Sequence, residues 1–133
     1  MARYLIGYVA AAAVMAALDL VWLKFAVKAV YEPAIGPLLS ERTNHTAAAL
    51  FYVLYVLAIM FFASGPALRG GSFLSALTMG AAFGFFAYMT YDLTNMATLK
   101  VWPVQLAAID ITWGTALTAL AASAGYAAGA RFG

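Results

Sequence analysis

The chain has 133 residues, of which 66% are hydrophobic and only 9% are charged, and its mean hydropathy is +0.92. Soluble domains carry about a quarter charged residues, so this composition excludes a water-soluble globular protein and makes lipid part of its surroundings. The formal net charge of +2, with scattered basic residues, argues against nucleic-acid binding, and the absence of cysteine excludes disulfides and thiolate metal sites.

Four hydrophobic stretches of roughly 20 residues, the length that a bilayer core requires, predict an all-α integral membrane four-helix bundle in one domain. The first stretch is longer than the core of a usual signal peptide, so we expect a spanning helix rather than a cleaved leader. Pro103 suits the first turn of the last helix. The predicted spans are approximately residues 4–27, 47–63, 73–93 and 104–128, with a longer polar connection at residues 28–46.

Four spans put both termini on the same side of the membrane. Lysine and arginine residues nearly balance between the two sides, so their distribution alone does not fix the orientation. Lys24 and Lys28 end a helix and can extend their ammonium groups to the interface from either side. We therefore expect the termini in the cytoplasm.

Small residues four apart allow helix backbones to approach closely in membranes. Gly80 and Gly84 form such a pair in the third span, and Gly125 and Gly129 form another in the fourth. Both pairs fit a monomeric bundle with its small residues inside, and they also fit a homodimer through one of these faces. The lipid bilayer is the other partner that the sequence indicates.

All three aspartates, Asp19, Asp92 and Asp110, lie in or at the end of a span, whereas both glutamates lie in the polar connection. A charge near mid-bilayer costs about 2.5–3.5 kcal/mol, so we expect these acids to face the bundle interior. Counting helical rise puts Asp19 roughly 12 Å and Asp110 roughly 10 Å below one membrane face, with Asp92 about one turn from it. The sequence predicts a shared acidic layer in the half-bilayer opposite the termini.

Aromatic and polar side chains recur at helical spacing around these acids. Trp22 follows Asp19 by three residues and Trp113 follows Asp110 by three, so each indole shares a helix face with an acid. Such pairs can simply clamp helices together, but three acids exceed what clamping usually needs. The other candidate binding residues of this layer are Tyr88, Asn95, Tyr52, Tyr55 and Lys100.

Asp19, Asp92 and Asp110 are the metal ligands to expect if a metal binds, because carboxylates favour hard cations, and clustered carboxyls also suit a proton relay. No histidine lies in a span and no lysine lies at mid-span, which argues against haem and retinal, and no other cofactor is indicated. Three functions remain open. They are binding or translocation of a small cation, proton or polar solute; an enzyme acting on a lipid or isoprenoid-like substrate; and an accessory or assembly subunit of a membrane complex.

Several motifs of aromatic, acidic and polar residues lie along the chain. They are Leu18-Asp19 with Trp22-Leu23, Phe51-Tyr52 with Tyr55, Tyr91-Asp92-Leu93-Thr94-Asn95 with Thr98-Leu99-Lys100 and Trp102-Pro103, and Asp110 with Trp113-Gly114-Thr115. With these motifs the chain resembles, over essentially its whole length, a family of small predicted bacterial membrane proteins, domain of unknown function 2177. The resemblance implies a four-span protein of the bacterial inner membrane, and it implies no activity, substrate or catalytic residue.

Overall fold

The computed structural model describes residues 1–133 and contains helices and no strand. The all-α prediction is confirmed, because four helices are long and apolar enough to cross a membrane: Ala2–Leu38, His45–Leu68, Phe73–Thr98 and Val104–Phe132. Many large apolar side chains on them, such as Leu5, Leu20 and Phe61, are exposed. Apolar surface of this extent is typical of helices that face lipid.

The first membrane helix is longer than the sequence predicts. α1 (Ala2–Ala26) continues directly into a π-helical turn, η1 (Val27–Tyr31), then into α2 (Glu32–Ile35) and a 3₁₀ turn, η2 (Gly36–Leu38). Residues 28–38, expected in the polar connection, are therefore helical. The connection shrinks to residues 39–44.

The second membrane helix repeats this construction. It consists of α3 (His45–Ile59), a second π-helical turn, η3 (Met60–Ser64), and α4 (Gly65–Leu68). At its start, the Asn44 side chain accepts a hydrogen bond from the Ala47 backbone N–H at 3.0 Å, which satisfies one of the unpaired donors of the first turn.

Both π-helical turns precede a proline by two residues. A proline inside a helix lacks the N–H that would bond the carbonyl four residues earlier, and its ring presses against that carbonyl. For Pro33 this residue is Ala29, and for Pro66 it is Phe62, and each is the middle residue of its π-helical turn. The widened turns thus let each helix pass its proline without breaking.

The last two helices form a close hairpin. α5 (Phe73–Thr98) begins at Ser72, which exchanges side-chain and backbone hydrogen bonds with Ser75, and α6 (Val104–Phe132) begins directly after Pro103, as predicted. The turn before α5 includes Gly70 at φ 153°, a conformation that residues with a side chain rarely adopt.

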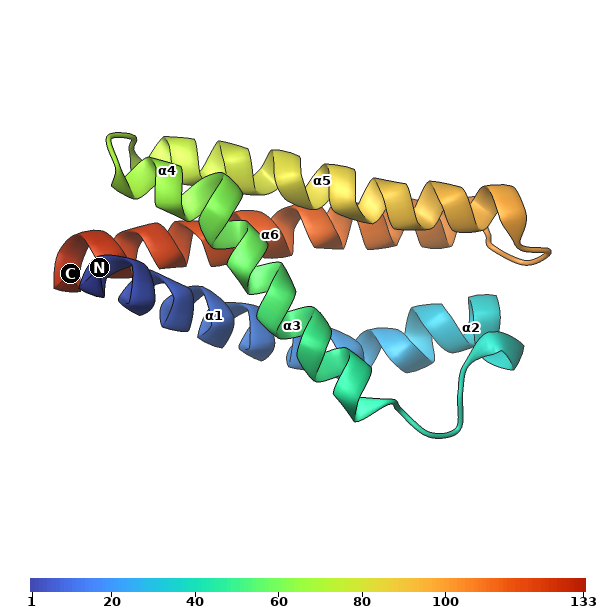
Figure 1. Ribbon diagram of the computed structural model, residues 1–133. Helices are drawn as coiled ribbons and strands as arrows, with labels where there is room; N and C mark the ends of the chain where they lie inside the picture. The colour runs from blue at the N-terminus through green and yellow to red at the C-terminus, as the bar shows by residue number, and fades with distance from the viewer.

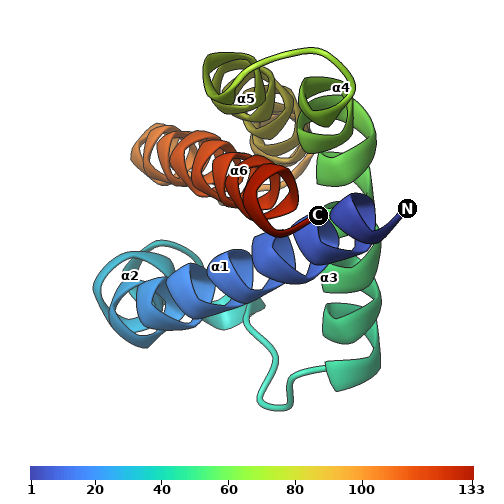
Figure 2. The ribbon, with the colours of Figure 1, turned by 90° about the vertical axis from the view of Figure 1, so that its left-hand side faces the viewer.

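α6 is the central helix of the bundle. It lies between α1 and α5 and contacts both along much of its length (Figure 2). The start of α1 and the end of α6 lie beside each other at one end of the bundle (Figure 1). That both ends lie on one side of a membrane stays a prediction. The core where α1, α3, η3 and α6 meet consists of Ala11, Met15, Tyr55, Val56, Ile59, Ala63, Leu117, Ala121 and Ala122.

The two glycine pairs lie inside this bundle. Gly80 and Gly84 contact α6, so that the α5 backbone approaches the α6 backbone. Gly125 lies against the α1 backbone at Gly7, and Gly129 lies against Arg3. All four glycines therefore pack against helices of their own chain. A homodimer through one of these pairs stays a prediction.

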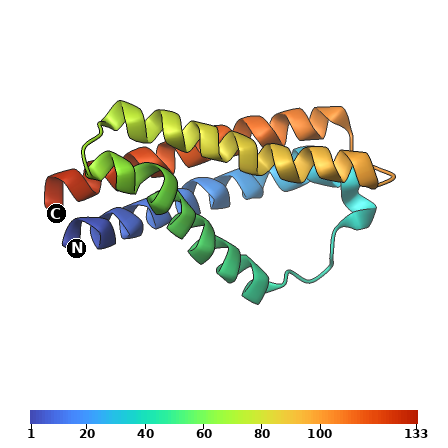
Figure 3. The ribbon, with the colours of Figure 1, turned by 45° about the horizontal axis from the view of Figure 1, so that its top comes forward.

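α3 does not follow the other helices. It crosses them obliquely (Figure 1), and its beginning stands away from α5 (Figure 3). Only the far end of this membrane helix packs closely on α5, through η3. The bundle is thus tight between α5 and α6 and splayed between α3 and α5.

Substituting Gly84 with alanine tests the tight side. An added methyl group at Gly84 would lie 2.5 Å from the Gly114 carbonyl oxygen and 2.6 Å from the Thr118 side chain. We expect Gly84→Ala to lower the free energy of unfolding by about 1–3 kcal/mol, measured in detergent, because α5 must move away from α6. The matched control is Gly36→Ala, whose methyl group meets nothing within 4 Å. Equal stability of the two variants would contradict the close approach.

Candidate functional site

The three aspartates of the predicted layer come from three different helices and are withdrawn from the surface. Asp92 of α5 is 0% exposed, Asp110 of α6 is 6% exposed, and Asp19 of α1 is half-buried. A buried carboxylate requires hydrogen-bond donors or positive charge around it. The donors that surround each acid therefore define the site.

Asp19 connects α1 to α3 and α6. One of its carboxyl oxygens accepts a hydrogen bond from the Tyr52 hydroxyl. The other accepts from the indole N–H of Trp113 at 3.3 Å. Both partners were predicted for this layer, but the indole comes from α6 and not from Trp22 on the same helix.

Asp110 is bound by a residue outside the predicted set. The Tyr31 hydroxyl donates to Asp110 Oδ1 at 2.6 Å and accepts from the Trp22 indole N–H at 3.3 Å. Trp22 in turn stacks on Trp113, with ring centroids 4.6 Å apart and planes 10° apart. The two indoles thus link the surroundings of Asp19 to those of Asp110.

Asp92 meets Asp110 at the tight contact between α5 and α6. The Trp102 indole N–H, from the loop before α6, donates to Asp92 Oδ1 at 3.2 Å. The Asp110 carboxyl lies close to that of Asp92. Asp92 Oδ2 is buried and has no hydrogen-bond partner, which is rare for a polar atom away from water.

These contacts form one continuous set of side chains, which we call the aspartate network. It draws on all four membrane helices and on the loop between α5 and α6. In order along its contacts, the network consists of Tyr52, Asp19, Trp113, Trp22, Tyr31, Asp110, Asp92 and Trp102.

The network does not gather all three acids around one point. No group of three or more histidine, cysteine, aspartate or glutamate residues could hold a metal ion. The stacked indoles of Trp22 and Trp113 separate Asp19 from the Asp92–Asp110 pair along the network. Asp19, Asp92 and Asp110 thus do not form such a group in this structure, and a metal ion held by them stays an untested expectation.

The remaining predicted residues have different positions. Tyr55 is bonded to Thr118 at 2.8 Å and meets the ring of Tyr88 edge-on, with centroids 6.3 Å apart. Asn95 lies beside Tyr91. Lys100 is exposed in the loop after α5 and takes no part in the network.

Tyr31 and Trp102 are the network residues that sequence reasoning missed. Tyr31 falls in the predicted polar connection, residues 28–46, where charged residues, prolines and glycines indicate a break between spans. A helix can pass a proline by way of a π-helical turn, so Pro33 did not require the helix to end before Tyr31. Trp102 belongs to a family motif, but its loop position gives no helical spacing to pair it with Asp92.

A cavity of about 550 Å³ lies next to Asp110, on the splayed side of the bundle. Five aromatic rings, from η1, α3 and α5, form most of its wall. Asp110 is the only charged residue in that wall. The lining residues are Tyr31, Phe51, Tyr55, Ala87, Tyr88, Tyr91 and Asp110.

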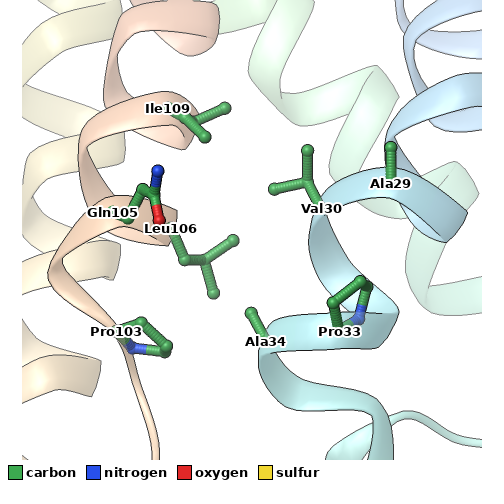
Figure 4. Close-up of a pocket in the computed structure, with 8 residues that line it drawn as sticks. All are labelled: Ala29, Val30, Pro33, Ala34, Pro103, Gln105, Leu106 and Ile109. Carbon is green, nitrogen blue, oxygen red and sulfur yellow. The ribbon is translucent and has the colours of Figure 1, made fainter.

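A smaller cavity of about 350 Å³ separates residues 29–34 from the beginning of α6 (Figure 4). Gln105 is the only residue with a polar side chain among the eight that line it. The Tyr31–Asp110 hydrogen bond joins the same two segments, since Tyr31 follows Val30 and Asp110 follows Ile109. This cavity therefore adjoins the network but offers no acid or base of its own.

Removing the Tyr31 hydroxyl tests the network. In Tyr31→Phe, Asp110 loses a donor and Trp22 loses an acceptor, so we expect the free energy of unfolding to fall by about 1–3 kcal/mol. Tryptophan fluorescence should shift as well, because the Trp22 indole N–H in the stacked pair loses its hydrogen bond. Tyr126→Phe is the matched control, since Tyr126 contacts Phe73 through its ring. Identical stability and fluorescence in both variants would contradict the network.

No curated protein and no solved structure matches the chain. A family model described as "Predicted membrane protein (DUF2177)" matches residues 4–127, a range that includes every residue of the aspartate network and of both cavities. The four apolar helices agree with that description. The chain therefore belongs to the DUF2177 family of integral membrane proteins.

Proposed function

We propose that this protein binds a small organic cation inside the membrane, in the aromatic cavity beside Asp110. The observation that carries the proposal is the composition of the cavity wall, in which five aromatic rings surround one carboxyl group. Aromatic faces carry partial negative charge and attract cations, and aromatic cages are the usual way in which proteins bind quaternary ammonium groups.

Asp110 supplies the counter-charge for this cation. Its Oδ1 accepts from the Tyr31 hydroxyl at 2.6 Å, which holds the carboxyl at the cavity wall. The cavity wall is aromatic and apolar apart from Asp110, so the attraction between a carboxylate and a cation is stronger here than in solution. Together the rings and the carboxyl favour a cation over a neutral molecule of the same shape.

The position of the cavity supports an amphiphilic or membrane-permeant cation rather than a hydrated metal ion. The cavity lies on the splayed side of the bundle, and two of its aromatic residues, Phe51 and Tyr91, are exposed at the surface. A metal ion would need several oxygen ligands at once, and the wall offers a single carboxyl group. We propose the bacterial inner membrane as the location, with both termini in the cytoplasm.

The enzyme hypothesis has less support. An enzyme acting on lipid would need a groove near the first and last spans with acid or base groups in it. The smaller cavity lies between those spans, but its side chains are apolar apart from the Gln105 amide. A purely structural, accessory role explains the fully bonded Asp19, but it does not explain the unpartnered oxygen of Asp92.

Choline and its neutral carbon isostere, 3,3-dimethylbutan-1-ol, test the proposal on purified protein in nanodiscs. Calorimetric titration should detect choline binding and much weaker binding of the isostere, because only choline carries a charge. Asp110→Asn should weaken choline binding by about 2–5 kcal/mol, roughly thirtyfold or more, since the buried counter-charge is lost. Glu32→Gln removes an exposed acid outside the network and is the matched control. Equal binding of the two molecules, or of Asp110→Asn and the wild type, would overturn the proposal.

A further inference from the structure

The Asp92–Asp110 pair has two carboxyl groups, whereas a singly charged cation needs only one negative charge. Asp92 is fully buried, and its only hydrogen bond comes from the Trp102 indole N–H at Oδ1. Its Oδ2 is buried without a partner, and the Asp110 carboxyl lies beside it. Two ionised carboxylates in this position would repel each other and would leave a charged oxygen with no donor.

The groups that face the pair include no base. Asp110 receives the Tyr31 hydroxyl from η1, and Asp92 receives Trp102 from the loop. Tyr91 of α5 lies near both acids, and Tyr88, also of α5, lies near Asp110. Tyr88 lies in turn near Asp19 of α1 and Tyr55 of α3, which are farther from the pair. Lys100, in the same loop as Trp102, is exposed. These neighbours are acids, phenols and an indole, so no lysine, arginine or histidine among them neutralises the second carboxyl.

A single proton resolves both problems. A carboxylic acid group donates a hydrogen bond to a carboxylate beside it, and it reduces the charge of the pair from two to one. We propose that the Asp92–Asp110 pair holds one proton in the empty protein and releases it when an organic cation enters the aromatic cavity. This inference rests on the proposed function, which it extends from binding to exchange of a proton for a cation.

The charges balance in this exchange. Before binding, the pair with its proton carries one negative charge. On binding, the O–H bond breaks, its electron pair stays on the carboxyl oxygen, and the proton passes to water in the cavity, which Asp110 lines. The cation then adds one positive charge beside two carboxylates. The site carries one negative charge before and after, so the apolar bundle never holds two unbalanced charges.

Calorimetric titration of choline in buffers with different ionisation enthalpies measures the proton directly. We expect about one proton to leave the wild-type protein for each choline bound. By linkage, the choline Kd should fall about tenfold for each unit rise in pH over the range where the empty pair holds its proton. Glu32→Gln should release the same number of protons as the wild type.

Asp92→Asn separates exchange from binding. The asparagine amide supplies an N–H donor to Asp110 in place of the proton, and Asp110 keeps its charge for the cation. We expect this variant to bind choline without proton release and with a Kd that no longer depends on pH. Proton release equal to that of the wild type would assign the proton to another group and overturn the inference.

The outcomes for the wild type distinguish the two proposals even if Asp92→Asn does not fold. Choline binding without proton release, at every pH at which the protein stays folded, overturns the exchange and leaves the proposed function intact. Absence of choline binding overturns the proposed function and the exchange together. Binding with one proton released supports both.

Discussion

Hydrocarbon contains no hydrogen-bond donors, so each acid within this bundle depends on other parts of the chain for its partners. Asp19 receives donors from α3 and α6, Asp110 from η1, and Asp92 from the loop before α6. None of these donors comes from the α-helix that carries the acid. The acids are therefore stabilised only when the helices associate. The aspartate network lies in the half of the bundle where α3 splays away and helix packing is incomplete.

The two sides of the bundle differ because their residues differ in size. Along α5 and α6, Gly80, Gly84 and Gly114 bring the two backbones together and fix the position of Asp92 against Asp110. Between α3 and α5, large aromatic residues hold the helices apart and enclose the cavity. A rigid acidic pair thus borders a space with aromatic walls. A site needs both properties if it is to present charge at a fixed point and still admit a ligand.

The four spans and the shared level of the acids could be predicted because hydrophobic length and helical rise are properties of a single helix. The partners of the acids could not, because they depend on how neighbouring helices turn toward one another. The i, i+3 spacing paired Trp22 with Asp19 and Trp113 with Asp110, whereas Trp113 bonds Asp19 and Trp22 reaches Asp110 through Tyr31. The polar connection predicted at residues 28–46 is the largest departure. The π-helical turn before Pro33 lets the helix continue through this stretch and brings Tyr31 into the network.

The length of the first membrane helix has a consequence for how the protein fits its bilayer. A helix of 37 residues extends about 55 Å, against a hydrocarbon thickness of roughly 30 Å. Its last third, which carries Tyr31, must tilt or project into the headgroup region, and the degree of tilt follows the local thickness of the membrane. Because Tyr31 bonds Asp110 from this end of the helix, a membrane thickness that changed the tilt would also move a hydrogen-bond donor of the acidic pair.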